Sequence, residues 1–242
     1  LPLAISPLVL NPDYGWRWGM GALAIAFFFF AFVPGFLLLK PAPTPDSDAD
    51  TTVPADGVEL RTAMRSITLW ALALGSACLW FSIQSMNSQV TIFFEQEAAL
   101  TPQRATLLFS LIFWCSFFGK FLFGAVSDFI AKRHVMQIAS CILFMGCLLL
   151  FNYSGGELSL TTDGLRLTLF AAVFGLGFGG CFTMIQLVAV ESFGQRSLGK
   201  ILGFIVFIDS TGAALGTVLI GQLRTSTGDY LVPFLVVTAV AA

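Results

Sequence analysis

The sequence predicts an all-α fold, a polytopic helical membrane protein, and two observations support this prediction. Of the 242 residues, 57% are hydrophobic and only 11% are charged, and the mean hydropathy is +0.86, whereas about a quarter of the residues of a soluble domain are charged. The charges are also unevenly spread, since long apolar blocks alternate with short charged ones. A helix needs about 20 apolar residues to cross a bilayer, so each long block is a candidate span.

The apolar blocks predict the order of the spans. Residues 1–10 are typical of the end of one span, and residues 16–39 form the next. The Pro- and Asp-rich residues 41–60 are typical of a disordered linker. Five more spans and the start of a sixth are expected at 67–94, 104–126, 135–153, 166–190, 199–222 and 230–242. Because the chain begins with Leu1 and stops inside an apolar run, we expect a fragment of a longer protein.

The basic residues of the loops predict the orientation of the spans. One set of loops holds Lys40, Arg61, Arg65, Lys132, Arg133, Arg196 and Lys200, and the other holds Arg17, Arg104, Arg166 and Arg224. Since Lys and Arg are more frequent in cytoplasmic loops, the linker is predicted to be cytoplasmic, and a topology shifted by one span is the alternative. We expect a multi-pass protein of the plasma membrane or of a bacterial inner membrane.

The residues that enzymes use for chemistry are scarce or poorly placed. The chain has one histidine, His134, and its five cysteines lie inside apolar blocks without a metal-binding spacing. The sequence GLGFGG at residues 175–180 contains G-x-G-x-x-G, but it lies in an apolar span with no soluble strand before it, so we interpret it as a helix-packing segment. We expect no enzyme, no metal, no cofactor and no nucleic-acid partner.

A loop motif after residues 104–126 indicates a family. The sequence GAVSDFIAKR holds Gly124, then Asp128, then Lys132 and Arg133. A carboxylate at a helix C-terminus opposes the helix dipole, so Asp128 needs a partner, whereas the two cations suit anionic lipid. The loop resembles the Gly-x-x-x-Asp-Arg-x-Gly-Arg-Arg signature of the major facilitator superfamily, from which it departs at two positions, Phe129 and Ala131. The sequence GWRWGM at 15–20 is also similar to the start of the sixth span of such transporters.

The resemblance implies a domain organisation and a mode of action. Residues 1–40 would be the end of span 5 and span 6 of the N-terminal half, residues 41–65 the cytoplasmic central linker, and residues 66–242 the C-terminal six-helix bundle with its last span truncated. Proteins of this kind are secondary transporters that rock around a central site. We expect a monomer in the lipid bilayer with a small-molecule substrate.

Lys120 is the main candidate for substrate binding. A charge in mid-membrane costs about 2.5–3.5 kcal/mol and normally faces the bundle interior. Helical side chains lean toward their own N-terminus, which is the outer end here, so Lys120 leans toward the membrane centre; extension to the cytoplasmic interface is the alternative. Phe113, Ser116 and Phe117 share its helix face and are predicted to line the same cavity. A cation among aromatic rings suits a small organic anion.

A second resemblance concerns the same helix. The sequence GKFLFG at 119–124 is similar in position to the eighth span of monocarboxylate transporters and oxalate–formate antiporters. In those families a basic residue, normally Arg, lies four residues before the Gly of the loop motif and holds the substrate carboxylate, which implies this role for Lys120. The monocarboxylate pattern also has an Asp where this chain has Ser116, so a proton relay within this helix is not expected.

Two further polar features lie inside predicted spans. Asp209 has no second charge within a turn, so it is either protonated or paired across helices with Lys120; a coupling role and a structural one are both open. In WFSIQSMNSQVT (80–91), Gln84, Asn87 or Ser88, and Thr91 form one stripe. Such a stripe does not face lipid, so we predict that Gln84 and Asn87 line the substrate path, with interhelical hydrogen bonding as the alternative.

Two features are assigned to structure instead. The small residues Gly212, Ala213 and Gly216 are expected to allow close helix packing. Glu191, near the cytoplasmic end of its span, is expected to pair with a loop cation.

The predicted function is secondary transport of a small, monocarboxylate-like organic anion, coupled to protons or by exchange. One alternative is a transporter of the same superfamily for a neutral or cationic solute. The other is a non-transporting membrane sensor or scaffold.

Overall fold

The computed structural model describes residues 15–38 and 57–242, which belong to two units, Leu1–Pro54 and Ala55–Ala242. The span end predicted at residues 1–10 and most of the predicted linker lie outside the described residues. Each unit is considered by itself.

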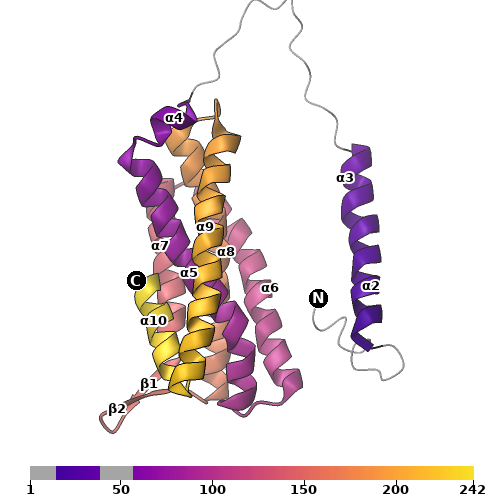
Figure 1. The fold of residues 1–242 in the computed structure, drawn as a ribbon, viewed down its shortest axis with the longest axis vertical. Helices are drawn as coiled ribbons and strands as arrows, with labels where there is room; N and C mark the ends of the chain where they lie inside the picture. Colours follow the sequence, from indigo (N-terminus) through magenta and orange to yellow (C-terminus); the bar gives the residue numbers. More distant parts are fainter. Residues whose placement is uncertain (1–14, 39–56) are drawn as a thin grey trace, which may run out of the picture. The chain divides into compact units, whose positions relative to one another are not determined.

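The first unit contains one continuous apolar helix. It consists of α2 (Gly15–Phe27), the π-helical turn η1 (Phe28–Phe32) and α3 (Val33–Leu38) (Figure 1). Pro34 has no N–H to donate to the carbonyl four residues earlier, which explains why the α-helical pattern changes just before it. Residues Arg17–Leu37 are long and apolar enough to cross a membrane, which confirms the span predicted at 16–39.

The second unit is a helical bundle with one hairpin. Its elements are α4 (Leu60–Ala63), α5 (Ile67–Gln96), α6 (Pro102–Val126), α7 (Lys132–Leu148), β1 (Phe151–Ser154), β2 (Glu157–Leu160), α8 (Gly164–Phe193), α9 (Leu198–Thr227) and α10 (Leu231–Ala241) (Figure 1). Four of them, α5, α6, α8 and α9, are long and apolar enough to cross a membrane. The all-α membrane fold predicted from the sequence is therefore confirmed.

The span predicted at 135–153 is wrong at its C-terminal end. The helix α7 has 17 residues and ends at Leu148, and β1 and β2 then pair antiparallel with Phe151 opposite Leu160. Between the strands, Gly155 and Gly156 have φ of 63° and 91°, the left-handed conformation that a two-residue hairpin turn requires and glycine adopts without strain. Apolar content alone extended the predicted helix through this hairpin.

The disordered linker predicted over residues 41–60 is wrong for its last residues. Val58 donates a backbone hydrogen bond of 2.9 Å to Phe193 at the end of α8, and Gly57 forms a bridge with Gly194. The Arg196 guanidinium also lies 2.9 Å from the Glu59 carboxylate. These contacts fix the chain before α4, and Val58 and Leu60 also pack against a buried hydrophobic cluster of the bundle.

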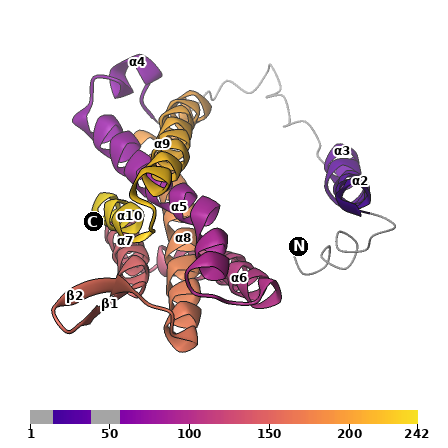
Figure 2. The ribbon, with the colours of Figure 1, turned by 60° about the horizontal axis from the view of Figure 1, so that its bottom comes forward.

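Glycines determine which helices touch. The helix α8 lies between α6 and α7 (Figure 2). A Cβ added at Gly175 or Gly179 would collide with the backbone of α6, and one at Gly177 would come within 2.5 Å of the backbone of Leu143 in α7. The helix-packing interpretation of residues 175–180 is confirmed.

A second close contact joins α5 and α9. A Cβ at Gly212 would come within 2.5 Å of the Ala77 carbonyl oxygen, and one at Gly216 within 2.6 Å of the Phe81 carbonyl oxygen. The packing role predicted for these two glycines is confirmed, whereas Ala213 lies on a different side of α9. Small residues thus let two helix pairs approach at backbone distance.

The two ends of the bundle differ in their ion pairs. At the end with the predicted cytoplasmic loops, Lys132 at the start of α7 pairs with Glu191 of α8 at 3.8 Å, as predicted for Glu191. At the opposite end, Glu97 pairs with Arg224 at 3.7 Å. The start of α7 thus lies beside the end of α8, and the end of α5 lies beside the end of α9.

We expect Gly179→Ala to lower the melting temperature of the purified protein in detergent. The new methyl group would meet the Ser116 backbone oxygen, which cannot rotate away, and overpacking of this kind costs about 1–3 kcal/mol. Gly203→Ala in α9 is the matched control, because no atom lies within 4 Å of its added Cβ. The control is expected to raise the melting temperature slightly, since Ala favours a helix over Gly by about 0.5–1 kcal/mol. Equal melting temperatures for the two variants would contradict the packing described for Gly179.

Candidate functional site

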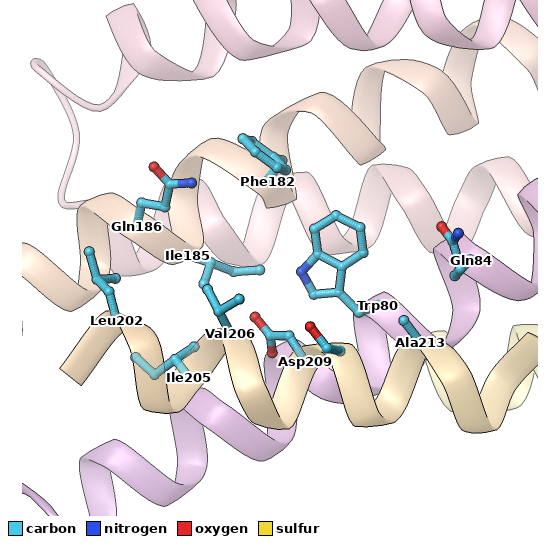
Figure 3. Close-up of a pocket in the computed structure, with 11 residues that line it drawn as sticks. Trp80, Gln84, Phe182, Ile185, Gln186, Leu202, Ile205, Val206, Asp209 and Ala213 are labelled. Carbon is cyan, nitrogen blue, oxygen red and sulfur yellow. The ribbon is translucent and has the colours of Figure 1, made fainter. Parts of the chain in front are cut away.

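A cavity of about 490 Å³ lies among α5, α8 and α9 (Figure 3). Most of its wall is apolar, from Trp80, Phe182, Ile185, Leu202, Ile205 and Val206. Its polar groups are Gln84 of α5, Gln186 of α8, and Asp209 and Ser210 of α9. A mostly apolar cavity with a few polar groups is the usual form of a small-molecule site.

Helical spacing places α9 against both the cavity and α5. Val206, then the adjacent pair Asp209 and Ser210, then Ala213 follow at steps of three or four residues and form the cavity side of the helix. Gly212, on the adjacent side, holds α9 against α5. Asp209 therefore lies at the border between the cavity and the α5–α9 contact, and only 6% of its surface is exposed.

Asp209 has a hydrogen-bond partner on α5. The Ser76 hydroxyl donates to the Asp209 carboxylate, and Ser76 is itself fully buried. The expected ion pair between Lys120 and Asp209 is not formed, because Lys120 lies on α6 and its ammonium group is 4.3 Å from the ring centroid of Phe182. The two charges lie beside different partners, one on α5 and one on α8.

The contact between α6 and α8 explains the position of Lys120. Gly119 and Gly179 bring the two backbones together, and a Cβ at Gly179 would lie 3.0 Å from the Lys120 backbone nitrogen. Phe182 is one turn further along α8, within reach of the lysine side chain. Lys120 is half-buried and forms no ion pair with any described residue.

The predicted site residues are only partly brought together. Of these, Gln84 and Asp209 line the cavity. Phe113 packs edge-on against Phe109 and Phe178, with centroids 5.1 and 6.2 Å apart.

Five of the six predicted substrate contacts are not among the residues that line the cavity: Lys120, Phe113, Ser116, Phe117 and Asn87. Ser116 is 3% exposed and lies against α8 at Gly179, and Phe117 packs on Phe121 with centroids 5.0 Å apart. A shared helix face therefore did not place Ser116 and Phe117 beside this cavity, since α6 turns that side toward α8 or outward. A role for Phe113, Ser116 and Phe117 in substrate contact stays a prediction.

Asn87 does not line the cavity, whereas Gln84 does, although both belong to the polar run of α5. Its Oδ1 atom is buried and has no hydrogen-bond partner among the described residues. An unpaired buried amide oxygen is costly, and its predicted role in the substrate path stays a prediction.

Sequence reasoning missed the aromatic and amide groups of α8. Phe182 and Gln186 are four residues apart and both line the cavity. Gln186 is a polar residue in a long apolar block, and this signal was available. Trp80 was visible at the start of the polar run, but its ring contact with Phe182, at 5.9 Å between centroids, depends on how α5 packs near α8.

The loop motif lies at the predicted cytoplasmic end. Gly124 is half-buried near Thr183 of α8, and Lys132 forms its ion pair with Glu191. Asp128 and Arg133 are exposed. The carboxylate of Asp128 has no hydrogen bond or ion pair with the part of the chain that the structure describes, so its expected partner stays a prediction.

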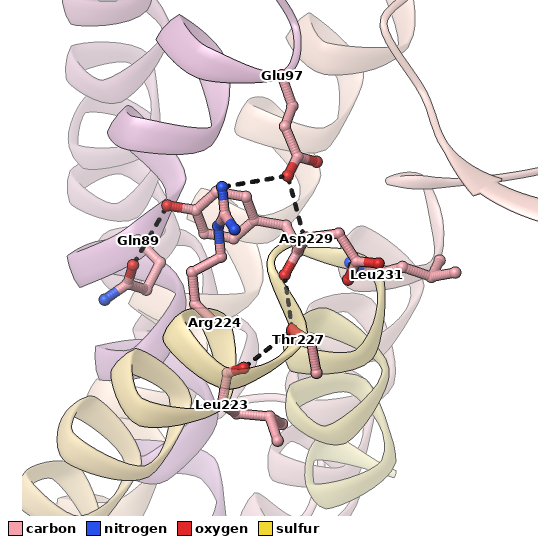
Figure 4. A network of polar contacts seen from close by, with 8 residues as sticks. Gln89, Glu97, Leu223, Arg224, Thr227, Asp229 and Leu231 are labelled. Atoms are coloured by element: carbon pink, nitrogen blue, oxygen red, sulfur yellow. Dashed lines mark hydrogen bonds and ion pairs between the residues drawn. The ribbon is translucent and has the colours of Figure 1, made fainter.

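A polar network joins three helices at the opposite end (Figure 4). The Glu97 carboxylate accepts a hydrogen bond of 3.1 Å from the Tyr230 backbone N–H and lies 3.7 Å from the Arg224 guanidinium. Arg224 also lies 4.4 Å from the centroid of the Tyr230 ring. Burial raises the pKa of Glu97, while the Arg224 cation and the Tyr230 N–H act in the opposite direction. The network holds the ends of α5, α9 and α10 together.

Comparison with known proteins identifies the family. The sequence model of the family described as Major Facilitator Superfamily matches residues 3–217. A protein of Aspergillus flavipes named MFS-type efflux transporter ffsH is 24% identical over 193 residues, which are 75% of this chain and 29% of that protein. The chain therefore belongs to the major facilitator superfamily, as the loop motif predicted.

Two solved structures share the fold. Tetrameric PepTSo2 matches with a TM-score of 0.63 and 14% identity over 72% of this chain and 38% of that one. A bacterial homologue of the human lysosomal transporter Spinster, inward-facing and unoccupied, matches with a TM-score of 0.52 and 15% identity over 89% of this chain and 48% of that one. The chain thus spans less than half the length of each of these proteins.

We expect Arg224→Gln to lower the melting temperature in detergent, because it removes both the ion pair with Glu97 and the contact with the Tyr230 ring. The two contacts together are worth about 1–2 kcal/mol at a partly exposed site. Arg196→Gln is the matched control: its ion pair with Glu59 joins side chains that are 56% and 59% exposed, so its loss should change the melting temperature very little. A larger decrease in melting temperature for Arg196→Gln than for Arg224→Gln would contradict the role given to the network.

Proposed function

Because the chain belongs to the major facilitator superfamily, we propose that it forms one half of a secondary transporter for a small, monocarboxylate-like organic anion. The proposal rests on one observation: the Lys120 ammonium, inside an apolar helix, has the Phe182 ring as its neighbour and forms no ion pair with a carboxylate of residues 15–38 or 57–242. Phe182 also lines the cavity. A substrate carboxylate is the counter-charge that this cation lacks.

Energies support this interpretation of Lys120. A lysine inside a membrane helix costs up to about 2.5–3.5 kcal/mol, whereas a cation–π contact returns about 0.5–2 kcal/mol. The contact with Phe182 therefore leaves Lys120 incompletely stabilised. Binding of an anion would make up the difference, which is the property expected of a substrate-binding charge.

Asp209 is the proposed coupling group. Its carboxylate borders the cavity, accepts a hydrogen bond from Ser76 and has no cationic partner among the described residues. A carboxyl group in such a place can take up a proton when substrate binds and release it on the other side. Proton coupling or exchange is therefore part of the proposal.

A second candidate function has one observation in its favour. The Asp209 carboxylate shares the cavity with the rings of Trp80 and Phe182, a combination that also suits a cationic or neutral solute.

The relative from Aspergillus flavipes is named an efflux transporter, which supports export as the direction of transport. We propose a monomer in the plasma membrane or a bacterial inner membrane, with the central linker in the cytoplasm; a non-transporting sensor is the remaining alternative.

We predict that Lys120→Ala abolishes uptake of labelled carboxylates by cells that express the full-length protein, without loss of protein from the membrane. The substitution removes a costly charge, so folding should not suffer. Lys120→Arg should retain transport, because guanidinium also binds carboxylate. Lys200→Ala, an exposed cation of the loop side, is the control and should transport normally. Normal carboxylate uptake by Lys120→Ala would refute the proposed role of this charge.

We predict that Asp209→Asn flattens the dependence of carboxylate uptake on external pH. The amide keeps the size of the side chain and can accept the Ser76 hydrogen bond, but it cannot bind and release a proton. The measurement is initial uptake at a series of pH values, compared with Ser210→Ala, a neighbouring cavity residue without a titratable group. An unchanged pH profile in Asp209→Asn would assign Asp209 to structure alone.

A further inference from the structure

We infer that the anion carried by this site has a bulky, flat apolar body and an uncharged hydrogen-bonding group, and is thus an aromatic carboxylic acid in preference to a short-chain one. This inference rests on the proposed function and specifies the substrate class of the same cavity.

The size of the cavity is the first argument. Its volume is about 490 Å³. A two- or three-carbon acid would fill only a small part and would leave water against apolar side chains. Cavities of about 300–1,000 Å³ are typical of sites for drug-sized ligands.

The shape of the apolar wall is the second argument. The rings of Trp80 and Phe182 meet at 74°, with centroids 5.9 Å apart, and both line the cavity. The branched side chains of Ile205 and Val206 belong to the same wall, on α9. Aromatic groups prefer edge-to-face and offset contacts with other rings. A planar ring system is therefore the body that can use this wall best.

The polar groups are the third argument. Gln84 and Gln186 lie on either side of Trp80 in Figure 3, on α5 and α8, and Ser210 lies on α9. Amides and hydroxyls donate and accept hydrogen bonds without charge. They suit a hydroxyl, ether or carbonyl on the ligand, and such a site rejects an analogue that leaves these groups unpaired.

The position of Lys120 relates the charge to the ring. Its ammonium lies 4.3 Å from the centroid of Phe182, and Phe182 also contacts Trp80. Lys120 itself is not among the residues that line the cavity, but the Phe182 ring that it contacts is. A ligand whose carboxylate is attached close to its ring system can meet Lys120 while the rings lie beside Trp80.

The test measures uptake of a labelled carboxylate by cells that express the full-length protein, in the presence of unlabelled competitors. Acetate and lactate are compared with cinnamate, 4-hydroxycinnamate and 2-naphthoate, and each aromatic acid is paired with its carboxamide. We expect the aromatic acids to inhibit at concentrations at least about tenfold lower than the short acids. The carboxamides should inhibit weakly, because they lack the charge for Lys120.

Two variants connect this preference with the cavity. Trp80→Ala should raise the inhibitory concentration of the aromatic acids about tenfold and leave that of the short acids unchanged. Ala213→Leu, which adds volume inside the cavity, should have the same selective effect if Trp80→Ala fails to reach the membrane. Trp70→Ala is the control: Trp70 packs on Phe204 and donates to the Met64 carbonyl, away from the cavity lining.

The outcomes separate the inference from the proposed function. If short and aromatic acids inhibit equally and Trp80→Ala affects both alike, the inference is overturned while anion transport stands. If no carboxylate of either kind inhibits and Lys120→Ala is neutral, the proposed function fails and the inference falls with it. Selective loss of the aromatic acids in Trp80→Ala, with Trp70→Ala unaffected, would support both.

Discussion

The backbone contact between α6 and α8 determines the position of the most unusual side chain in the protein. Gly119 and Gly179 remove the side chains that would hold the two helices apart, and a Cβ at Gly119 would lie 2.5 Å from the Leu176 carbonyl oxygen. Lys120 follows Gly119 directly, so its charge is set against α8 and near Phe182. Since α8 is also held against α7 through Gly177, it has little freedom to move away.

The cavity lies between two closely packed groups of helices. Small residues hold the helices together within each group, and large side chains separate the two groups. Glycines bring α9 onto α5 and α8 onto α6, whereas α8 and α9 touch each other much less. Trp80 and Phe182 stand in the space between them, and their rings cannot pack as closely as two backbones. The arrangement leaves two closely packed helix groups with a partly open space between them, which is where a ligand can bind without disturbing either group.

The sequence predicted the membrane helices from the length of the apolar segments and the close helix contacts from the small size of the residues. It predicted the Glu191 ion pair from the position of this residue near basic loops. It did not predict the hairpin at residues 151–160, because two short strands inside a mostly apolar region resemble the end of a span. It also offered Lys120 as the partner of Asp209 if that carboxylate is paired. Helical spacing shows which residues share a face, but not which helix that face meets, so Ser76 and Phe182 could not be identified as the actual partners.

The separation of Lys120 from Asp209 has a consequence for transport. A direct ion pair would neutralise both groups, and a substrate anion would then have to break it before binding. Here Asp209 is held by a neutral hydroxyl on α5 and Lys120 by a neutral ring on α8. Neither contact removes the charge, so the cation remains ready for a carboxylate and the acid remains ready for a proton. Under the proposed function, substrate binding and proton binding occur at distinct places: Phe182, the neighbour of Lys120, lines the cavity that Asp209 also lines.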